Sequence, residues 1–319
     1  MKKWLLTCML AIFAVVLAAC GSDEASKEEK SADTPKEEAK TVTVQHKYGE
    51  VEVPVNPEKV VVFDFGSLDT IHALGATDSV VATAKDSLPE YLSDFNKDDV
   101  LNAGGLKEPD FEAIHEAQPD LIIISGRQAD SYDKFAEIAP TVYVELDAAN
   151  YMDSFESNVN MLAEIYGKED AAKEKLAEVE AAVEEAKGKV DTSKKGLIVL
   201  SNAGEISAYG AGSRFGMIHD VLGVAQADEK IEVSTHGQNV TSEYVLEKNP
   251  DYLFVIDRDA AVGTEGSSKE TIENAIIKKT NAFKDGKIIY LNPQYWYLSG
   301  GGIESVTEMV KEVSEGVVQ

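Results

Sequence analysis

The chain has 319 residues, of which 57 are acidic and 30 are basic, so its formal net charge is −27 at pH 7. No basic stripe is present to neutralise phosphates, and this composition argues against nucleic acid as a partner. The chain is long enough for one large domain or two lobes.

The first residues predict an export signal. A basic start is followed by an apolar stretch at 4–17, too short for a permanent transmembrane helix, and by Leu-Ala-Ala-Cys at 17–20. We predict a lipoprotein signal peptide over 1–19 with Cys20 lipidated as the first mature residue. An ordinary secretory signal that ends in cysteine by chance is the alternative. Because Cys8 lies inside the signal, the mature chain has no disulfide and no cysteine-ligated metal site.

The composition then divides the chain. Residues 20–40 are mostly small and charged, which predicts a disordered tether. Residues 41–57 alternate with period two and predict an edge hairpin. After them, apolar strands alternate with helices, which is typical of parallel sheets covered on both faces. The proline-free segment 167–190 predicts one long rigid helix. We therefore expect an α/β fold of two parallel-sheet, Rossmann-like lobes, 41–166 and 191–319, joined by that helix, with a ligand cleft between them.

Two segments in the middle of the chain resemble each other. PDFEAIHEAQPDLIIISGRQ (109–128) and VTSEYVLEKNPDYLFVIDRD (240–259) place a glutamate, a Pro-Asp pair and an arginine at the same spacing, offset by 131 residues. Each copy predicts a short helix, a turn, a buried strand and an arginine in the loop that follows the strand. In open parallel sheets, ligands bind beyond that end of the strands. The equivalent pairs are Glu112 with Glu243, Pro119 with Pro250, and Arg127 with Arg258.

The chain has only three arginines, against 27 lysines. The third, Arg214, lies in the glycine loop GAGSRFG (210–216), whose glycine spacing does not match a dinucleotide loop. Guanidinium is always charged and presents a rigid donor fork that suits multidentate anions. If the lobes face each other, the three arginines converge on an anionic ligand. The alternative is that each arginine makes a structural salt bridge.

Several aromatic and histidine residues are candidates for the cleft wall. Trp296 and Tyr297 precede three glycines and are expected either to stack on ligand rings or to plug a tight turn. Tyr209, beside the arginine loop, is a similar case, and His236 is a loop histidine. The five histidines show no close metal-ligand spacing. No nucleophile elbow, zinc-protease helix or reactive cysteine indicates an enzyme.

The lipobox, the acidic tether, the two α/β lobes and the linking helix together resemble the substrate-binding lipoprotein of an iron-siderophore ABC importer, over essentially the whole chain. Finer stretches are similar to the Gram-positive binding proteins for ferric petrobactin, a catecholate-citrate siderophore. These stretches are VVVFDFGSLDT (60–70), GGLKEPDF (104–111), SGRQ (125–128), SRFGMIHDVLGV (213–224), STHGQNV (234–240) and YWYLSGGG (295–302).

The resemblance implies a monomeric, non-enzymatic receptor, lipid-anchored on the extracellular face of a Gram-positive cell membrane. Iron(III) would be carried within the siderophore, with no cofactor and no metal bound by protein ligands. In such proteins three arginines and a nearby lysine hold the chelate, which here points to Arg127, Arg214, Arg258 and Lys107. Other ligands remain open on the same fold, namely haem, a corrinoid, a bare metal ion or a ferric hydroxamate.

The same resemblance implies a partner, the permease dimer of the importer. In the family an exposed glutamate on each lobe contacts permease arginines, and the repeated Glu112 and Glu243 match that pattern. The alternative is that each carboxylate only stabilises the N-terminus of its helix.

Overall fold

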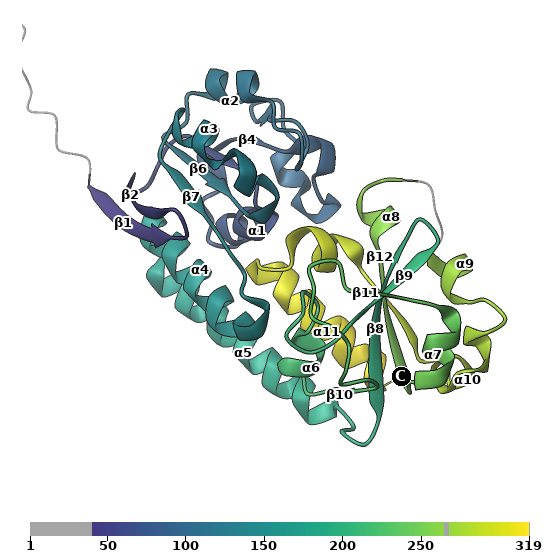
Figure 1. The fold of residues 1–319 in the computed structure, drawn as a ribbon. Coiled ribbons are helices and arrows are strands. Elements are labelled where there is room, and N and C mark those ends of the chain that lie inside the picture. The colour runs from purple at the N-terminus through teal and green to yellow at the C-terminus, as the bar shows by residue number, and fades with distance from the viewer. Residues whose placement is uncertain (1–39, 265–267, 319) are drawn as a thin grey trace, which may run out of the picture. The chain divides into compact units, whose positions relative to one another are not determined.

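The computed structural model describes residues 40–264 and 268–318. The expected signal peptide, Cys20 and nearly all of the expected tether lie outside these residues. The predicted α/β class with two lobes is confirmed, since the described chain forms one main sheet in each half, with helices packed around both (Figure 1). Among the described residues no helix combines the length and the apolarity needed to cross a bilayer.

The sheet of the first lobe is parallel throughout, in the order β5-β4-β3-β6-β7. Its central strands are buried on both faces, which explains why they read as unbroken apolar runs. The strands are β3 (Val60–Val62), β4 (Val80–Thr83), β5 (Leu101–Asn102), β6 (Leu121–Ile124) and β7 (Thr141–Tyr143). The connecting helices are α1 (Phe65–Ala73), η1 (Thr77–Ser79), η2 (Lys85–Ser87), η3 (Glu90–Phe95), α2 (Phe111–Ala117), η4 (Gly126–Ser131), α3 (Tyr132–Ala136) and η5 (Ala148–Asn150).

The hairpin predicted at 41–57 is confirmed. Strands β1 (Thr41–His46) and β2 (Gly49–Pro54) form a separate two-stranded antiparallel sheet. It is attached to the first lobe by side-chain packing, because Val44 and Val53 are buried in that lobe's core.

The sheet of the second lobe has a parallel centre and an antiparallel flank, in the order β11-β9-β8-β12-β13 with β10 beside β8. The antiparallel strands β9 and β11 were not predicted. Strand β9 follows β8 through the turn Ala203–Gly204, where both residues have positive φ, as a tight two-residue hairpin requires, and β11 then pairs with β9. The strands are β8 (Lys195–Asn202), β9 (Glu205–Tyr209), β10 (Ala225–Gln226), β11 (Gln238–Val240), β12 (Tyr252–Asp257) and β13 (Ile288–Leu291). The helices are α6 (Met217–Asp220), α7 (Ser242–Lys248), α8 (Arg258–Ala261), α9 (Ser268–Ile272), η6 (Ile277–Lys279) and α10 (Asn281–Lys284).

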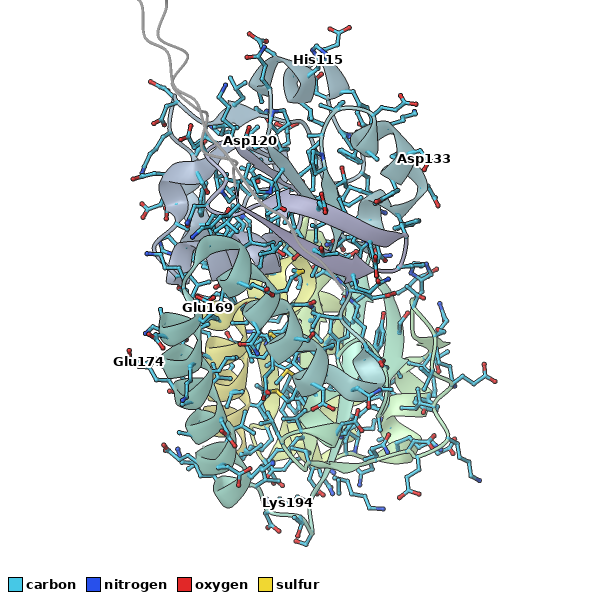
Figure 2. The ribbon with its side chains drawn as sticks, turned by 90° about the vertical axis from the view of Figure 1, so that its left-hand side faces the viewer. His115, Asp120, Asp133, Glu169, Glu174 and Lys194 are labelled. Atoms are coloured by element: carbon cyan, nitrogen blue, oxygen red, sulfur yellow. The ribbon has the colours of Figure 1, made fainter. Side chains whose placement is uncertain are left out.

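Two consecutive helices connect the sheets. Helix α4 (Tyr151–Tyr166) ends at Gly167, whose φ of +59° lets the chain reverse into α5 (Glu169–Lys189). The long helix predicted over 167–190 is therefore present. Its apolar stripe packs in the core of the second lobe, while Glu169 and Glu174 project outward (Figure 2). Where one lobe ends and the other begins stays a prediction.

The last helix starts against the first lobe and ends in the second. After β13, a π-helical turn η7 (Gln294–Ser299) leads into α11 (Ile303–Val318). The buried carboxylate of Asp69, on α1, accepts the backbone N–H groups of Glu304 and Ser305 at 2.9 and 2.7 Å and so caps α11. Burial raises the pKa of Asp69 to about 6, although these two hydrogen bonds act in the opposite direction. Because η7 directly precedes α11, this cap also fixes the position of η7 between the two sheets.

Candidate functional site: an arginine-lined cleft

Between the two sheets lies a cleft of about 820 Å³. One wall comes from the first lobe, from the segments after β4, β5 and β6. The other wall comes from α8 and the residues that follow it, and η7 forms part of the lining. The residues are Asp86, Ser87, Leu88, Pro89, Glu90, Gly105, Leu106, Lys107, Glu108, Arg127, Arg258, Ala260, Ala261, Val262, Gly263, Thr264, Gln294, Tyr297 and Leu298.

Arg127 enters the cleft from the first lobe. It follows β6 in a 3-10 turn that is held by a capping box, in which Ser125 and Gln128 exchange side-chain and backbone hydrogen bonds. The Nη2 atom of Arg127 donates to the carbonyl oxygen of Tyr297 at 2.7 Å. Burial lowers the pKa of the Arg127 guanidinium, and the charge of Arg214 lowers it further. The charges of Tyr297 and Asp64 raise this pKa, but burial and Arg214 outweigh them, and the net direction is down.

Arg214 reaches the same point, Tyr297, from the second lobe, although it is not itself part of the cleft lining. Its loop is fixed by internal hydrogen bonds, from Gly212 N–H to Asp220 and from the Ser213 hydroxyl to the carbonyl of Gly210. Arg214 donates to the carbonyl oxygen of Tyr297, and its guanidinium lies 4.3 Å from the centre of the Tyr297 ring. It therefore stacks on an aromatic face while its remaining donors stay accessible.

Arg258 begins α8, directly after β12, and its side chain is 31% exposed. Its Nε donates to the hydroxyl of Tyr297 at 3.3 Å, and its Nη1 donates to Oδ1 of Asn202 at 2.9 Å. The repeat therefore places two of the arginines, and all three meet at Tyr297.

The surroundings of Tyr297 contain little negative charge. In the part of the chain that the structure describes, the one salt bridge made by an arginine joins Arg258 to Asp259, at 3.9 Å. Burial raises the pKa of Tyr297, but the hydrogen bond from Arg258 and the three guanidinium charges outweigh burial, and the net direction is down. Three like charges that share a single carboxylate as a salt-bridge partner are suited to an anionic ligand.

The other predicted residues divide into two groups. Lys107 is exposed and lines the cleft. Trp296 does not, because it is 2% exposed and donates its indole N–H to Glu312 at 2.8 Å, which corrects its expected place on the cleft wall. Tyr209 is also buried, packed edge-on against Phe215.

His236 is exposed in its loop and is not part of the cleft lining. Tyr297 faces the cleft while its neighbour Trp296 faces the core, because consecutive residues of the π-helical turn point in different directions. The alternative role predicted for this region, a plug in a tight turn, fits Trp296.

Sequence reasoning missed the rest of the cleft wall. Leu88, Leu106 and Val262 give it an apolar component, and Asp86 and Glu90 give it acidic side chains. They lie in short 3-10 turns and loops whose composition does not differ from that of the rest of this acidic chain. The stretch GGLKEP did indicate that Lys107 lies beside the cleft, so a sequence motif predicted only this part of the wall.

Glu112 and Glu243 occupy equivalent places. Each is the second residue of a seven-residue helix, and each is exposed. The N-cap residues are Asp110 and Thr241, whose side chains accept backbone N–H groups of the first turn. Neither glutamate lies in the cleft.

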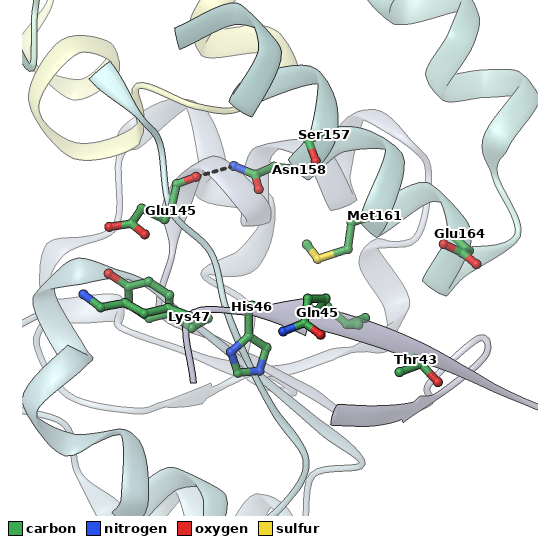
Figure 3. A pocket seen from close by; sticks show the side chains of 11 residues that line it. Thr43, Gln45, His46, Lys47, Glu145, Ser157, Asn158, Met161 and Glu164 are labelled. Carbon is green, nitrogen blue, oxygen red and sulfur yellow. Dashed lines mark hydrogen bonds between the residues drawn. The ribbon is translucent and has the colours of Figure 1, made fainter. Parts of the chain in front are cut away.

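A second hollow, of about 360 Å³, lies on the first lobe between β1, the end of β7 and α4 (Figure 3). His46, Lys47 and Glu145 line it, and Asn158 donates to the carbonyl of Glu145 at 3.0 Å. His219 has a structural contact elsewhere, since its Nδ1 lies 2.8 Å from the carbonyl oxygen of Val224. Over the described ranges, no three His, Cys, Asp or Glu side chains are grouped so as to hold a metal ion.

Comparison with known proteins adds to this geometry. The sequence profile of the periplasmic binding protein family matches residues 60–295. The chain is 49% identical over 320 aligned residues to the petrobactin-binding protein YclQ of Bacillus subtilis strain 168, with 99% of each chain covered. It is 31% identical to the ferric-anguibactin-binding protein FatB of Vibrio anguillarum, over 86% of this chain and 87% of that protein.

Solved structures have the same fold. The crystal structure of YclQ superimposes with a TM-score of 0.86 and covers 88% of this chain and 99% of that one. The periplasmic catecholate-siderophore binding protein VctP of Vibrio cholerae is 32% identical, with a TM-score of 0.80, and covers 86% of this chain and 100% of that one.

Proposed function

The chain belongs to the periplasmic binding protein family, and on that premise we propose that it is a non-enzymatic receptor that binds a ferric catecholate siderophore of the petrobactin type and delivers it to an ABC importer. Iron(III) would enter chelated by the siderophore, so that the protein recognises the outside of a metal complex and supplies no iron ligand.

One observation carries this proposal, the convergence of Arg127, Arg214 and Arg258 on Tyr297. Catecholate oxygens bound to iron(III) keep negative charge and accept charge-assisted hydrogen bonds, each worth roughly 1.5–3 kcal/mol. In the cleft these bonds are partly shielded from water. The ligand would also offset the mutual repulsion of the three guanidinium groups, whose one salt bridge among the described residues is the 3.9 Å contact of Arg258 with Asp259.

The remaining wall suits the other parts of such a ligand. Leu88, Leu106 and Val262 provide aliphatic surfaces against which a catechol ring can lie, in place of the Trp296 stack that the sequence suggested. Lys107 adds a positive charge at the exposed side of the cleft. A volume of about 820 Å³ falls within the range of ligand pockets.

We further propose that Glu112 and Glu243 contact the permease dimer and that a lipid on Cys20 holds the receptor at the membrane. The supporting observation for the glutamates is that both are exposed at the same position of repeated helices, one in each lobe. For Cys20 the support is the Leu-Ala-Ala-Cys motif at the end of an apolar signal.

The proposal is tested by titrating residues 21–319 with ferric petrobactin, iron-free petrobactin and ferric 3,4-dihydroxybenzoate. Trp296 is the only tryptophan of that segment and directly precedes Tyr297, so its fluorescence reports on the cleft. We expect ferric petrobactin to quench it at far lower concentration than the iron-free form. Binding of a ferric hydroxamate or of haem in place of both catecholates would overturn the ligand class while leaving the receptor fold intact.

A further inference from the structure

Arg258 is held by a part of the molecule that lies outside the repeat. Its Nη1 donates to Asn202, its Nε donates to Tyr297, and its Nη2 has no hydrogen-bond partner among the described residues. Because Arg258 lines the cleft while Asn202 does not, Asn202 contacts the guanidinium from behind. The two bonds restrict the plane of the guanidinium and leave Nη2 available to a ligand.

Asn202 stands at a strained turn. It is the last residue of β8 and pairs with Glu205 across the hairpin, so Ala203 and Gly204 alone make the turn. Ala203 has a φ of +50°, a conformation that residues with a Cβ atom rarely adopt. Such strain persists only where the surroundings enforce it, and it is commonly found at functional sites.

A buried carboxylate enforces this turn. Asp259, the neighbour of Arg258, is 6% exposed and accepts the backbone N–H of Ala203 at 2.7 Å. Its other oxygen lies 3.3 Å from the hydroxyl of Thr264 and 3.9 Å from Arg258. Residues 258 and 259 therefore connect α8 to the hairpin at two points, through Arg258 to Asn202 and through Asp259 to Ala203.

We propose that Asn202 is a positioning residue for ligand binding, which orients Arg258 from a turn that Asp259 fixes. This inference rests on the proposed function, because it assigns Asn202 an effect on affinity only through an arginine that binds the ferric ligand. If Asn202 had only a structural role, it would stabilise the hairpin and would have no specific effect on the orientation of Arg258.

A double-mutant cycle separates these roles. The full chain and its Asn202→Ala, Arg258→Ala and doubly substituted variants are titrated with ferric petrobactin. We expect Asn202→Ala to weaken affinity by about fivefold alone, because Arg258 loses one of the two bonds that orient it, and to add no loss when Arg258 is already alanine. An equal loss in both backgrounds, or no loss in either, would overturn the proposal.

Asn239→Ala is the matched control. Asn239 lies on β11 of the same sheet, contacts Glu205 through its amide at 3.3 Å and makes no contact with Arg258. Its substitution removes an amide of the same size next to the same hairpin and is expected to leave the affinity unchanged.

A ligand-free measurement keeps the inference distinct from the proposed function. Because the chain has only three arginines, a ¹⁵N–¹H spectrum contains only three arginine Nε–H signals, which single substitutions assign. We expect Asn202→Ala to accelerate the solvent exchange of the Arg258 Nε–H and to leave that of Arg127 unchanged. An unchanged Arg258 signal refutes positioning, whereas a changed signal in a protein that binds no ferric catecholate refutes only the proposed ligand.

Discussion

Segments 109–128 and 240–259 follow the same course from the N-cap of a helix to the end of a buried strand. Helices α2 and α7 both end in a residue of left-handed conformation, Gln118 or Asn249, which precedes the Pro-Asp pair. In both copies the aspartate carboxylate then accepts backbone N–H groups where the neighbouring strand begins, next to β3 for Asp120 and at β8 for Asp251. Local chemistry repeated at the same spacing has produced the same scaffold.

The copies differ where the strand ends. Arg127 lies in a 3-10 turn and donates to a backbone carbonyl, whereas Arg258 lies in α8 and donates to two side chains. The partners Asn202 and Tyr297 both come from outside the repeat. The repeat therefore determines where an arginine stands, and the segments packed against it determine how the guanidinium is held. Paired substitutions at equivalent positions test this separation.

The largest effect is expected from the glutamates. We expect Glu112→Ala with Glu243→Ala to abolish siderophore-dependent iron uptake by cells and to leave the affinity for ferric petrobactin unchanged, because both side chains are exposed outside the cleft. The matched control is Glu116→Ala with Glu247→Ala, an equally exposed pair on the same helices with the same offset. A loss of affinity in the first double variant would assign Glu112 and Glu243 to the site or the fold.

The second-largest effect is expected from substitution of the arginines. Arg127→Ala and Arg258→Ala should each weaken binding of ferric petrobactin by at least tenfold, or about 1.4 kcal/mol. We expect the larger loss at Arg127, because burial makes its bonds to an anion stronger. Lys173→Ala removes the same charge from the exposed face of α5 and controls for the net charge. Unchanged affinity in either arginine variant would contradict a site shared by both lobes.

The sequence predicted what each copy does locally but not what joins the copies. Helix, Pro-Asp turn, strand and arginine follow from residue types at short range. The meeting of the arginines at Tyr297 does not, because η7 lies 170 residues from Arg127 and is positioned by Asp69, whose burial no local pattern indicates. The hairpin at Ala203 was missed for a similar reason, since a turn of this kind ordinarily carries Asn-Gly, and here Asp259 stabilises it.

Substitution of the aspartate in each Pro-Asp turn should lower the free energy of unfolding by a different amount. Asp120 accepts two backbone N–H groups, at 3.1 and 3.0 Å, whereas Asp251 accepts one, at 2.9 Å, and a longer side-chain bond from Asn281, at 3.4 Å, that adds little. At roughly 1 kcal/mol for each bond, Asp120→Ala should lower the free energy of unfolding by about 2 kcal/mol and Asp251→Ala by about 1 kcal/mol. Urea denaturation measures both values, and ligand affinity below the transition serves as the control. A larger loss at Asp251 would mean that the two turns are not equivalent.

The smallest effect is expected at the C-terminal ends of α2 and α7. There, substitution by glycine should change the free energy of unfolding in opposite directions in the two copies. Gln118 has a φ of +49° with no side-chain bond to another described residue to compensate, and Asn249 has a φ of +42° but accepts the backbone N–H of Asn281 at 2.8 Å. Glycine adopts this conformation freely, so Gln118→Gly should raise the free energy of unfolding by about 0.5 kcal/mol. Asn249→Gly removes a hydrogen bond at a position that asparagine already tolerates, and should lower that free energy by about 0.5 kcal/mol. A shift of the same sign in both variants would show that backbone conformation alone governs these ends. Opposite signs would show that here, too, the contacts outside the repeat decide how each copy behaves.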